Sequence, residues 1–196
     1  MSDSPNTTKY RGPEIPTPLG DQLQLALGLD ERPETFGDWV DALAFIADRD
    51  NIDVDLNMLC TIDDSPHKAT FSGRTQHYQC FQDPIIVPFL AEDVDTVEIE
   101  TESPVSGEPI ELMVTETEIE ATPPDVVMSF GVAEDVGAPP EDVPSPILAY
   151  SRFCPYGNVF LSPEEYEAWT DEVNAITMAT DVDDTLELAR AIGEVA

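Results

Sequence analysis

The chain has 196 residues, and its 41 Asp and Glu against 8 Lys and Arg give a formal net charge of −33. Such a charge repels nucleic-acid phosphates and argues against DNA or RNA binding. The 41% of hydrophobic residues suffices for a core and argues against wholesale disorder. Because the acids are spread along the whole chain, as suits a cytoplasm of very high salt, we expect a halophilic, archaeal source.

The amino terminus lacks the basic start and apolar core of a signal peptide. No apolar run in the sequence is long enough to span a bilayer. We therefore expect a soluble, cytoplasmic protein that binds no membrane. The 3 cysteines do not predict a disulfide framework in such a reducing compartment, so they are buried thiols, metal ligands or reactive thiols.

The first third of the chain is predicted to be helical. Residues 1–17 are rich in Ser, Thr and Pro and are expected to form a flexible arm. Residues 18–29 have apolar side chains at helical spacing, and residues 35–50 show a clearer apolar face that includes Trp39. Residues 50–65 are expected to form a further short helix or an irregular segment.

From about residue 68 the pattern changes to strands. Alternating side chains over residues 68–79 predict a hairpin that turns at Ser72 and Gly73. Further strands are predicted over residues 96–103, 109–116, 125–132 and 156–162, and an acidic, Pro-rich loop over residues 133–146.

Two helices are predicted to close the chain. Ser162 fits an N-cap, Pro163 the first helical turn and Glu165 the capping-box position. Residues 182–193 are expected to form a final amphipathic helix. The predicted fold is therefore α+β, with a small helical N-terminal part followed by a mixed or antiparallel sheet domain with C-terminal helices.

The candidate chemistry lies at cysteines beside chain-bending residues. Cys80 is followed three residues later by Asp83, and in a helical or type I turn this spacing places both side chains on one side. Cys154 lies between the acidic loop and a strand. Core packing for either cysteine and a simple turn at Asp83 stay open as alternatives, and Cys60, with apolar neighbours, is expected to be a core residue.

Other common sites find no support in the sequence. The spacing of His67 and His77 matches no zinc motif, and no CxxC is present. The sequence contains no phosphate-binding glycine loop and no GxSxG, and no local motif indicates a Ser-His-Asp triad.

The segments YQCFQDP, VSGEPIELMVT, PDVVMSF and FCPYGNVFLSPEEYEAW, in this order, resemble the alkylmercury lyase (organomercurial lyase) family over about residues 70–195. The family pattern has Cys-x-x-Asp, a turn between two strands, a VSF strand, and a second FC before a Trp-containing helix. The counterparts in this chain are Cys80, Asp83, Gly107, Pro109, Ser129, Phe130, Cys154, Phe160, Ser162 and Trp169. The chain departs from the pattern at Gln79 (often aromatic), at Ser103 (a further Cys) and at Pro155 (Cys or a His-containing run).

The resemblance implies protonolysis of a carbon–mercury bond to Hg(II) and a hydrocarbon, as part of mercury detoxification. Cys80 and Cys154 would be the thiol ligands, as mercury's softness favours, and Asp83 the proton-transfer group. All three would contact the Hg(II) product transiently. The resemblance implies no organic cofactor; external thiols would help to remove Hg(II), and a mercuric reductase is the expected acceptor.

The resemblance also implies a domain organisation. Residues 18–68 would be a winged-helix-like N-terminal domain, with the hairpin at residues 69–79 as its wing-like end. Residues 69–196 would form the catalytic α+β domain.

Two other functions stay open as hypotheses. A non-enzymatic protein that binds Hg(II) or Cu(I) on the same fold would use the two thiols without the proton step. The variant Asp83→Asn separates this hypothesis from the lyase, since it should abolish cleavage and leave metal binding largely intact. A transcriptional regulator that binds DNA through the N-terminal helices is disfavoured by the few basic residues and many acids of residues 18–66.

Overall fold

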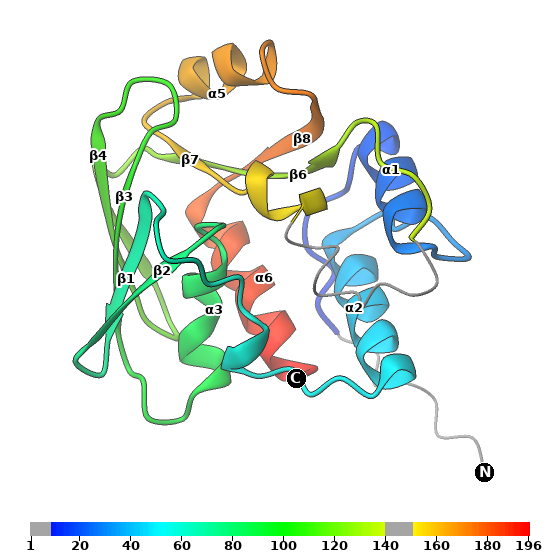
Figure 1. The fold of residues 1–196 in the computed structure, drawn as a ribbon, viewed down its shortest axis with the longest axis horizontal. Helices are drawn as coiled ribbons and strands as arrows, with labels where there is room; N and C mark the ends of the chain where they lie inside the picture. The colour runs from blue at the N-terminus through cyan, green and yellow to red at the C-terminus, as the bar shows by residue number, and fades with distance from the viewer. Residues whose placement is uncertain (1–8, 140–150) are drawn as a thin grey trace.

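A computed structural model describes residues 9–139 and 151–196 of the chain. The fold is α+β, as predicted, with one sheet on one side, two N-terminal helices on the other, and further helices between them (Figure 1). The helices are α1 (Thr17–Leu27), α2 (Phe36–Asp50), α3 (Asp83–Leu90), α5 (Pro163–Thr170) and α6 (Val182–Glu194), with short 3-10 turns η1 (Leu56–Met58) and η2 (Cys154–Tyr156). The strands are β1 (His67–Phe71), β2 (Arg74–Tyr78), β3 (Val97–Glu102), β4 (Pro109–Val114), β5 (Ile119–Thr122), β6 (Val127–Ala133), β7 (Val159–Phe160) and β8 (Ala175–Thr180).

The strands form two antiparallel sheets, one of order β2-β1-β3-β4-β5 and a smaller one of order β7-β6-β8. The predicted hairpin forms and turns at Ser72 and Gly73, both in the left-handed conformation. The expectation that this hairpin is a wing of the N-terminal domain is wrong. Its first strand pairs with β3, Ala69 opposite Ile99, because the alternating apolar side chains of both strands bury on the same face.

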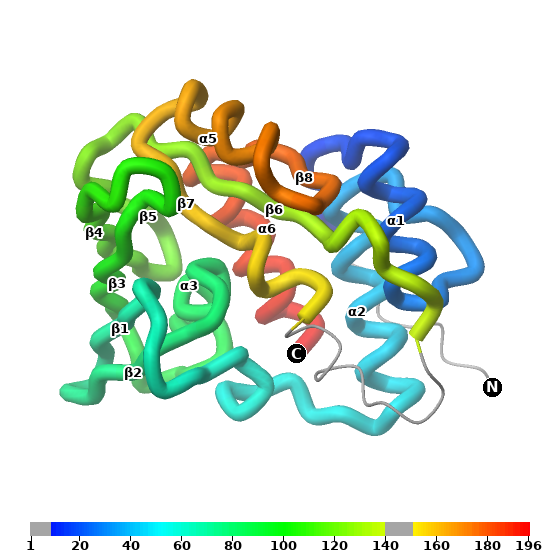
Figure 2. The backbone as a smooth tube through the Cα atoms, turned by 45° about the horizontal axis from the view of Figure 1, so that its top comes forward, coloured from blue at the N-terminus to red at the C-terminus, as the bar shows by residue number. Residues whose placement is uncertain are grey.

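The buried face of the larger sheet carries α3. Side chains alternate between buried and exposed along β3 and β4, as expected for a sheet with one solvated face. Ile85 and Val87 of α3 pack into the core of this face together with Val97 and Leu112. Helix α6 runs between α3 and α2 and connects the two halves of the molecule (Figure 2).

Helix starts follow the capping signals of the sequence. Thr35 and Asp38 form a reciprocal capping box at the start of α2. The predicted N-cap at Ser162 is confirmed, since its side chain accepts a hydrogen bond from the Glu165 amide. The Glu165 carboxylate does not complete a box; it accepts instead from the Leu161 amide at 3.1 Å and from the Ser103 hydroxyl at 2.6 Å.

The described part of the predicted N-terminal arm packs against the rest of the fold instead of extending from it. Residues 1–8 of the expected flexible arm lie outside the described residues, but the part that follows is packed. The Gly37 amide donates to the Arg11 carbonyl at 2.7 Å, and Ile15 is buried. Helices α1 and α2 share their apolar core with Phe130 of β6 and Leu188 of α6. The domain boundary near residue 68 stays a prediction.

Three elements were not predicted: α3, β5 and β8. Helix α3 has the sequence DPIIVPFL, in which the residues after Asp83 are all apolar and give no periodicity. It tolerates Pro84 in its first turn, where no intrahelical donor is needed. Of the predicted acidic loop, residues 140–146 lie outside the described residues. In the part of the chain that the structure describes, no helix combines the length and the apolarity that a bilayer crossing requires.

Candidate active site

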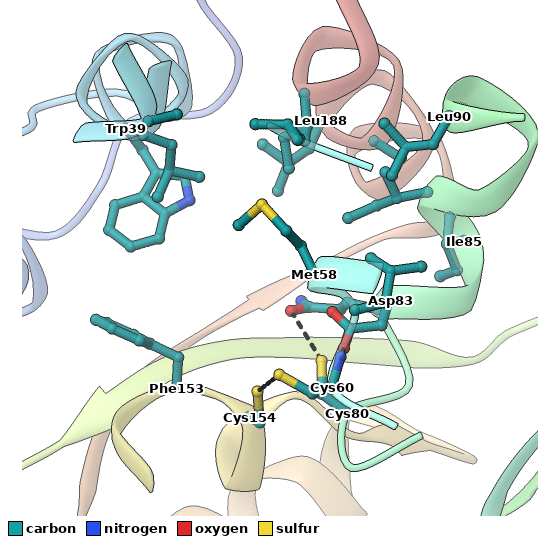
Figure 3. Close-up of a pocket in the computed structure, with 18 of the residues that line it drawn as sticks. Trp39, Met58, Cys60, Cys80, Asp83, Ile85, Leu90, Phe153, Cys154 and Leu188 are labelled. Carbon is teal, nitrogen blue, oxygen red and sulfur yellow. Dashed lines mark hydrogen bonds between the residues drawn. The ribbon is translucent and has the colours of Figure 1, made fainter. Parts of the chain in front are cut away.

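A cavity of about 260 Å³ lies between α2, α3 and α6, and its lining is mostly apolar. The chemically reactive side chains Cys60, Cys80, Asp83 and Cys154 gather at one end of it (Figure 3). The opposite end is formed by apolar side chains such as Trp39. The arrangement can therefore hold an apolar group beside a cluster of sulfur and carboxyl atoms.

Cys80 and Asp83 reach the cavity from the connection between β2 and α3. Strand β2 ends at Tyr78, and Asp83 is the first residue of α3. The connection is anchored by Gln82, whose side-chain amide donates to the Ser129 carbonyl of β6 at 2.9 Å. The three-residue spacing does place the thiol and the carboxyl in one cavity, and the alternative of a simple surface turn at Asp83 does not describe its position.

Cys154 reaches the same cavity from η2. Ser129 holds this turn: its hydroxyl donates to the Tyr156 carbonyl at 2.8 Å and accepts from the Asn158 amide at 3.0 Å. Gly157 lies so close to Cys80 that a Cβ atom at this position would be 2.9 Å from its Sγ atom. The glycine is therefore required for the approach of η2 to the Cys80 thiol.

Cys60 is the functional candidate that the sequence did not reveal. It is buried at 4% exposure, as expected of a core residue, but its buried neighbours are Cys80 and Cys154 rather than the apolar core. Its Sγ atom lies 2.8 Å from Sγ of Cys154, which is 94 positions away in the chain. No local signal distinguishes Cys60 from a packing residue, because its sequence neighbours are apolar.

Three side chains of this cluster have ligand atoms close enough for one metal ion. The sulfurs of Cys60 and Cys154 and a carboxylate oxygen of Asp83 are all within 4.8 Å of one another. All three cysteines of the chain are free. Thiolates are the preferred ligands of soft metals, so the donor set favours a soft ion over Mg²⁺ or Ca²⁺.

The Asp83 carboxyl is suited to proton transfer. Burial raises its pKa to about 6, although the hydrogen bond from the Cys60 amide acts in the opposite direction. At neutral pH the group is therefore mainly ionised but takes up a proton far more readily than an exposed aspartate. A pKa near the working pH is what a general acid–base group needs.

The three thiols keep their protons at neutral pH. The pKa of Cys80 is raised well above its ordinary value by its hydrogen bond with Cys154, by burial and by the Asp83 charge. The pKa of Cys154 is raised by its hydrogen bond with Cys60 and by burial. For Cys60 the contact with Cys154 lowers the pKa, but burial and the Asp83 charge together raise it by more, so the net shift is upward. Metal binding to this cluster must therefore release protons, and Asp83 is the adjacent group that can receive them.

The histidines lie outside the cavity lining. His67 is buried, which lowers its pKa to about 4, and its Nδ1 pairs with the Thr101 hydroxyl at 2.8 Å. Nδ1 of His77 pairs with the Ser65 carbonyl at 3.0 Å. Both imidazoles thus form hydrogen bonds with neighbouring groups of the fold.

The three departures from the family pattern have defined positions. The Gln79 amide donates to the Cys60 carbonyl at 2.7 Å, so this residue helps to place the third thiol. Ser103, buried at 1% exposure, hydrogen-bonds to Glu165 and does not line the cavity. Pro155 is part of η2, directly after Cys154.

Comparison with known proteins gives one family. The family model described as MerB, alkylmercury lyase, matches residues 61–194, which is more than half of the chain. No curated protein matches the sequence. Among solved structures, one described as the mercury-bound form of MerB2 matches at 22% identity and a TM-score of 0.48, over 67% of this chain and 57% of that one. The present chain therefore spans less than two thirds of the length of that protein.

Proposed function

The chain belongs to the alkylmercury lyase family, as its ordered motifs predicted, and we propose that it cleaves carbon–mercury bonds by protonolysis, giving Hg(II) and a hydrocarbon in mercury detoxification. One observation carries this proposal: Cys80, Cys154 and Asp83 meet at one end of an otherwise apolar cavity. The two cysteines serve as mercury ligands, and Asp83 moves the proton.

The chemistry needs only these groups and the substrate. The organomercurial arrives as a thiolate complex, R–Hg–SR′, and one cysteine thiol replaces the external thiol, which leaves as R′SH. The second cysteine gives its proton to Asp83 and binds mercury as a thiolate. Asp83 then passes the proton to carbon, the electron pair of the C–Hg bond forms the new C–H bond, and the hydrocarbon RH leaves. Nothing is oxidised or reduced.

The cavity accounts for the organic half of the substrate. Apolar cavities of about 150 Å³ bind benzene, so the roughly 260 Å³ available here has room for an aryl or short alkyl group. An apolar wall also excludes water from the reacting carbon. The apolar lining supports organomercurials, rather than hydrated metal ions alone, as the substrate class.

The same chemistry determines which other molecules and which compartment the proposed reaction needs. No organic cofactor takes part, and external thiols remove the Hg(II) product, for which a mercuric reductase is the acceptor. A reducing cytoplasm fits the contact between the free thiols of Cys60 and Cys154, since an oxidising compartment would favour a disulfide between them.

A second candidate function is a soft-metal binding protein for Hg(II) or Cu(I) that performs no cleavage. The additional thiol of Cys60 is the observation that favours it, because the proposed reaction uses two thiols and the third is then available for metal binding alone. The two candidates differ in one product, the hydrocarbon.

The experiment incubates the purified, reduced protein with phenylmercury and excess thiol in molar salt and measures benzene in the headspace. The lyase releases more than one benzene per chain, and the variants Cys80→Ser and Cys154→Ser release none above a control without protein. Binding of mercury without benzene release from the wild type would establish the binding protein instead.

A further inference from the structure

The third cysteine has no part in the reaction described above, and the family match begins one residue after it, at residue 61. We propose that Cys60 is a third sulfur ligand that holds the Hg(II) product together with Cys80 and Cys154. The site would then retain mercury in a three-sulfur complex until an external thiol or a protein acceptor removes it.

The backbone around Cys60 fixes the position of its side chain. The Cys60 amide donates to Asp83 Oδ2 at 2.6 Å, and its carbonyl accepts from the Gln79 amide at 2.7 Å. The next residue, Thr61, forms an antiparallel bridge with Tyr78, the last residue of β2. A segment held at so many points gives the thiol one direction, toward the cavity and the other two sulfurs.

The surroundings of the Cys60 sulfur are those of a ligand rather than of a packing residue. Its Sγ lies 2.8 Å from Sγ of Cys154, and these two sulfurs with the Asp83 carboxylate form a group whose ligand atoms are within 4.8 Å of one another. Cys80 belongs to the same buried cluster. Three thiols from three separate segments of the chain are thus buried together in one cluster, and thiolates are the donors that soft ions select.

The additional step balances without any redox change. After the hydrocarbon leaves, mercury is bound to two cysteine sulfurs, and Asp83 has returned to its carboxylate form. The Cys60 thiol gives its proton to this carboxylate, and its sulfur donates an electron pair to mercury, so that a neutral two-sulfur complex becomes an anionic three-sulfur complex. No bond to mercury breaks in this step.

This inference rests on the proposed function only for the origin of the metal, and Hg(II) itself can be supplied directly. The experiment adds one equivalent of HgCl₂ to the reduced protein and counts sulfur neighbours by X-ray absorption at the mercury edge. The wild type is expected to show three sulfurs and Cys60→Ser two. Cys60→Ser should also transfer Hg(II) to a competing dithiol faster than the wild type, because one bond to mercury is lost.

Two further variants make the comparison specific. Cys60→Ala removes the sulfur without placing a hydroxyl in a buried site, and it should behave like Cys60→Ser. Ile62→Val changes an exposed side chain of the same segment and should keep three sulfurs. Two sulfurs in the wild type, or three in both Cys60 variants, would overturn the inference, and the wild-type count decides the question even if the Cys60 variants do not fold.

The failure of this inference is distinguishable from the failure of the proposed function. If the wild type releases benzene from phenylmercury but binds Hg(II) through two sulfurs, the lyase stands and the third ligand does not. If the wild type binds Hg(II) through three sulfurs but releases no benzene, the site stands and the lyase activity does not.

Discussion

The backbone amide of Cys60 donates a 2.6 Å hydrogen bond to Oδ2 of Asp83. This contact connects the segment before β1 with the first residue of α3, so the same interaction places the third thiol and orients the carboxyl group. It also partly offsets the effect of burial on the carboxyl pKa, which stays raised at about 6. The proposed proton carrier therefore accepts a hydrogen bond from a residue that lies one position before the matched family region.

The raised pKa of Asp83 predicts a stability cost at neutral pH. The pKa is about 6 in the folded protein and 3.8 ordinarily, so the folded state binds the proton more tightly, and stability is lost as the pH rises from about 4 to about 6. Asp83→Asn keeps an oxygen to accept from the Cys60 amide and removes the buried charge. We expect it to be more stable than the wild type at pH 7 by about 1–3 kcal/mol, with a difference that shrinks toward pH 4.

Denaturant unfolding of both proteins at pH values between 4 and 8, at constant salt, measures this difference. Equal stability of Asp83→Asn and the wild type at pH 7 would show that the buried charge of Asp83 does not destabilise the folded protein.

Gly157→Ala tests the contact between η2 and the Cys80 thiol. The added Cβ would lie 2.9 Å from Cys80 Sγ and 3.1 Å from Gln82 Oε1, so the thiol or the turn must move. We expect a stability loss of about 1–3 kcal/mol and a clear loss of benzene release from phenylmercury. Gly137→Ala is the matched control, because a Cβ there meets no atom within 4 Å. A Gly157→Ala variant with wild-type activity would mean that the Cys80 position is not critical.

The dimensions of the cavity predict substrate selectivity. Ile86 is partly buried and lines the cavity, so Ile86→Phe should occupy space needed by the organic group. We expect kcat/KM for phenylmercury to fall by about tenfold relative to that for methylmercury. Leu25→Phe, at a position that is 45% exposed and away from the cavity, should leave the ratio unchanged. The same fall for both substrates in Ile86→Phe would indicate damage to the site rather than selection by size.

Much of the fold follows from local patterns in the sequence. The N-cap at Ser162 and the hairpin turn at Ser72 and Gly73 are interactions between residues close in the chain, and the structure contains them. The sequence does not predict helix α3, because the segment after Asp83 is apolar throughout, with no period to distinguish a helix from a buried strand. The sheet to which the hairpin belongs was also missed, since pairing with β3 is a long-range contact.

In the candidate site, too, contacts between residues close in the chain could be predicted and long-range contacts could not. Cys80 and Asp83 are three residues apart, so turn geometry alone suggests that they face one cavity. Cys154 could be joined to them only through the ordered resemblance to a family. Cys60 had neither kind of signal: its sulfur partner is 94 positions away, and the family match begins one residue later. Only the folded backbone shows that a cysteine among apolar residues belongs to the sulfur cluster.

The most direct test of the account is the rate of benzene release in a single turnover of phenylmercury by the wild type and by Asp83→Asn, with the mercury bound to each protein measured in the same samples. Removal of a general acid–base group typically slows a reaction by about 10²–10⁴-fold, and we expect a loss of this size while Asp83→Asn still binds one equivalent of Hg(II). Benzene release by Asp83→Asn at the wild-type rate would contradict the assignment of Asp83 as the group that delivers the proton to carbon.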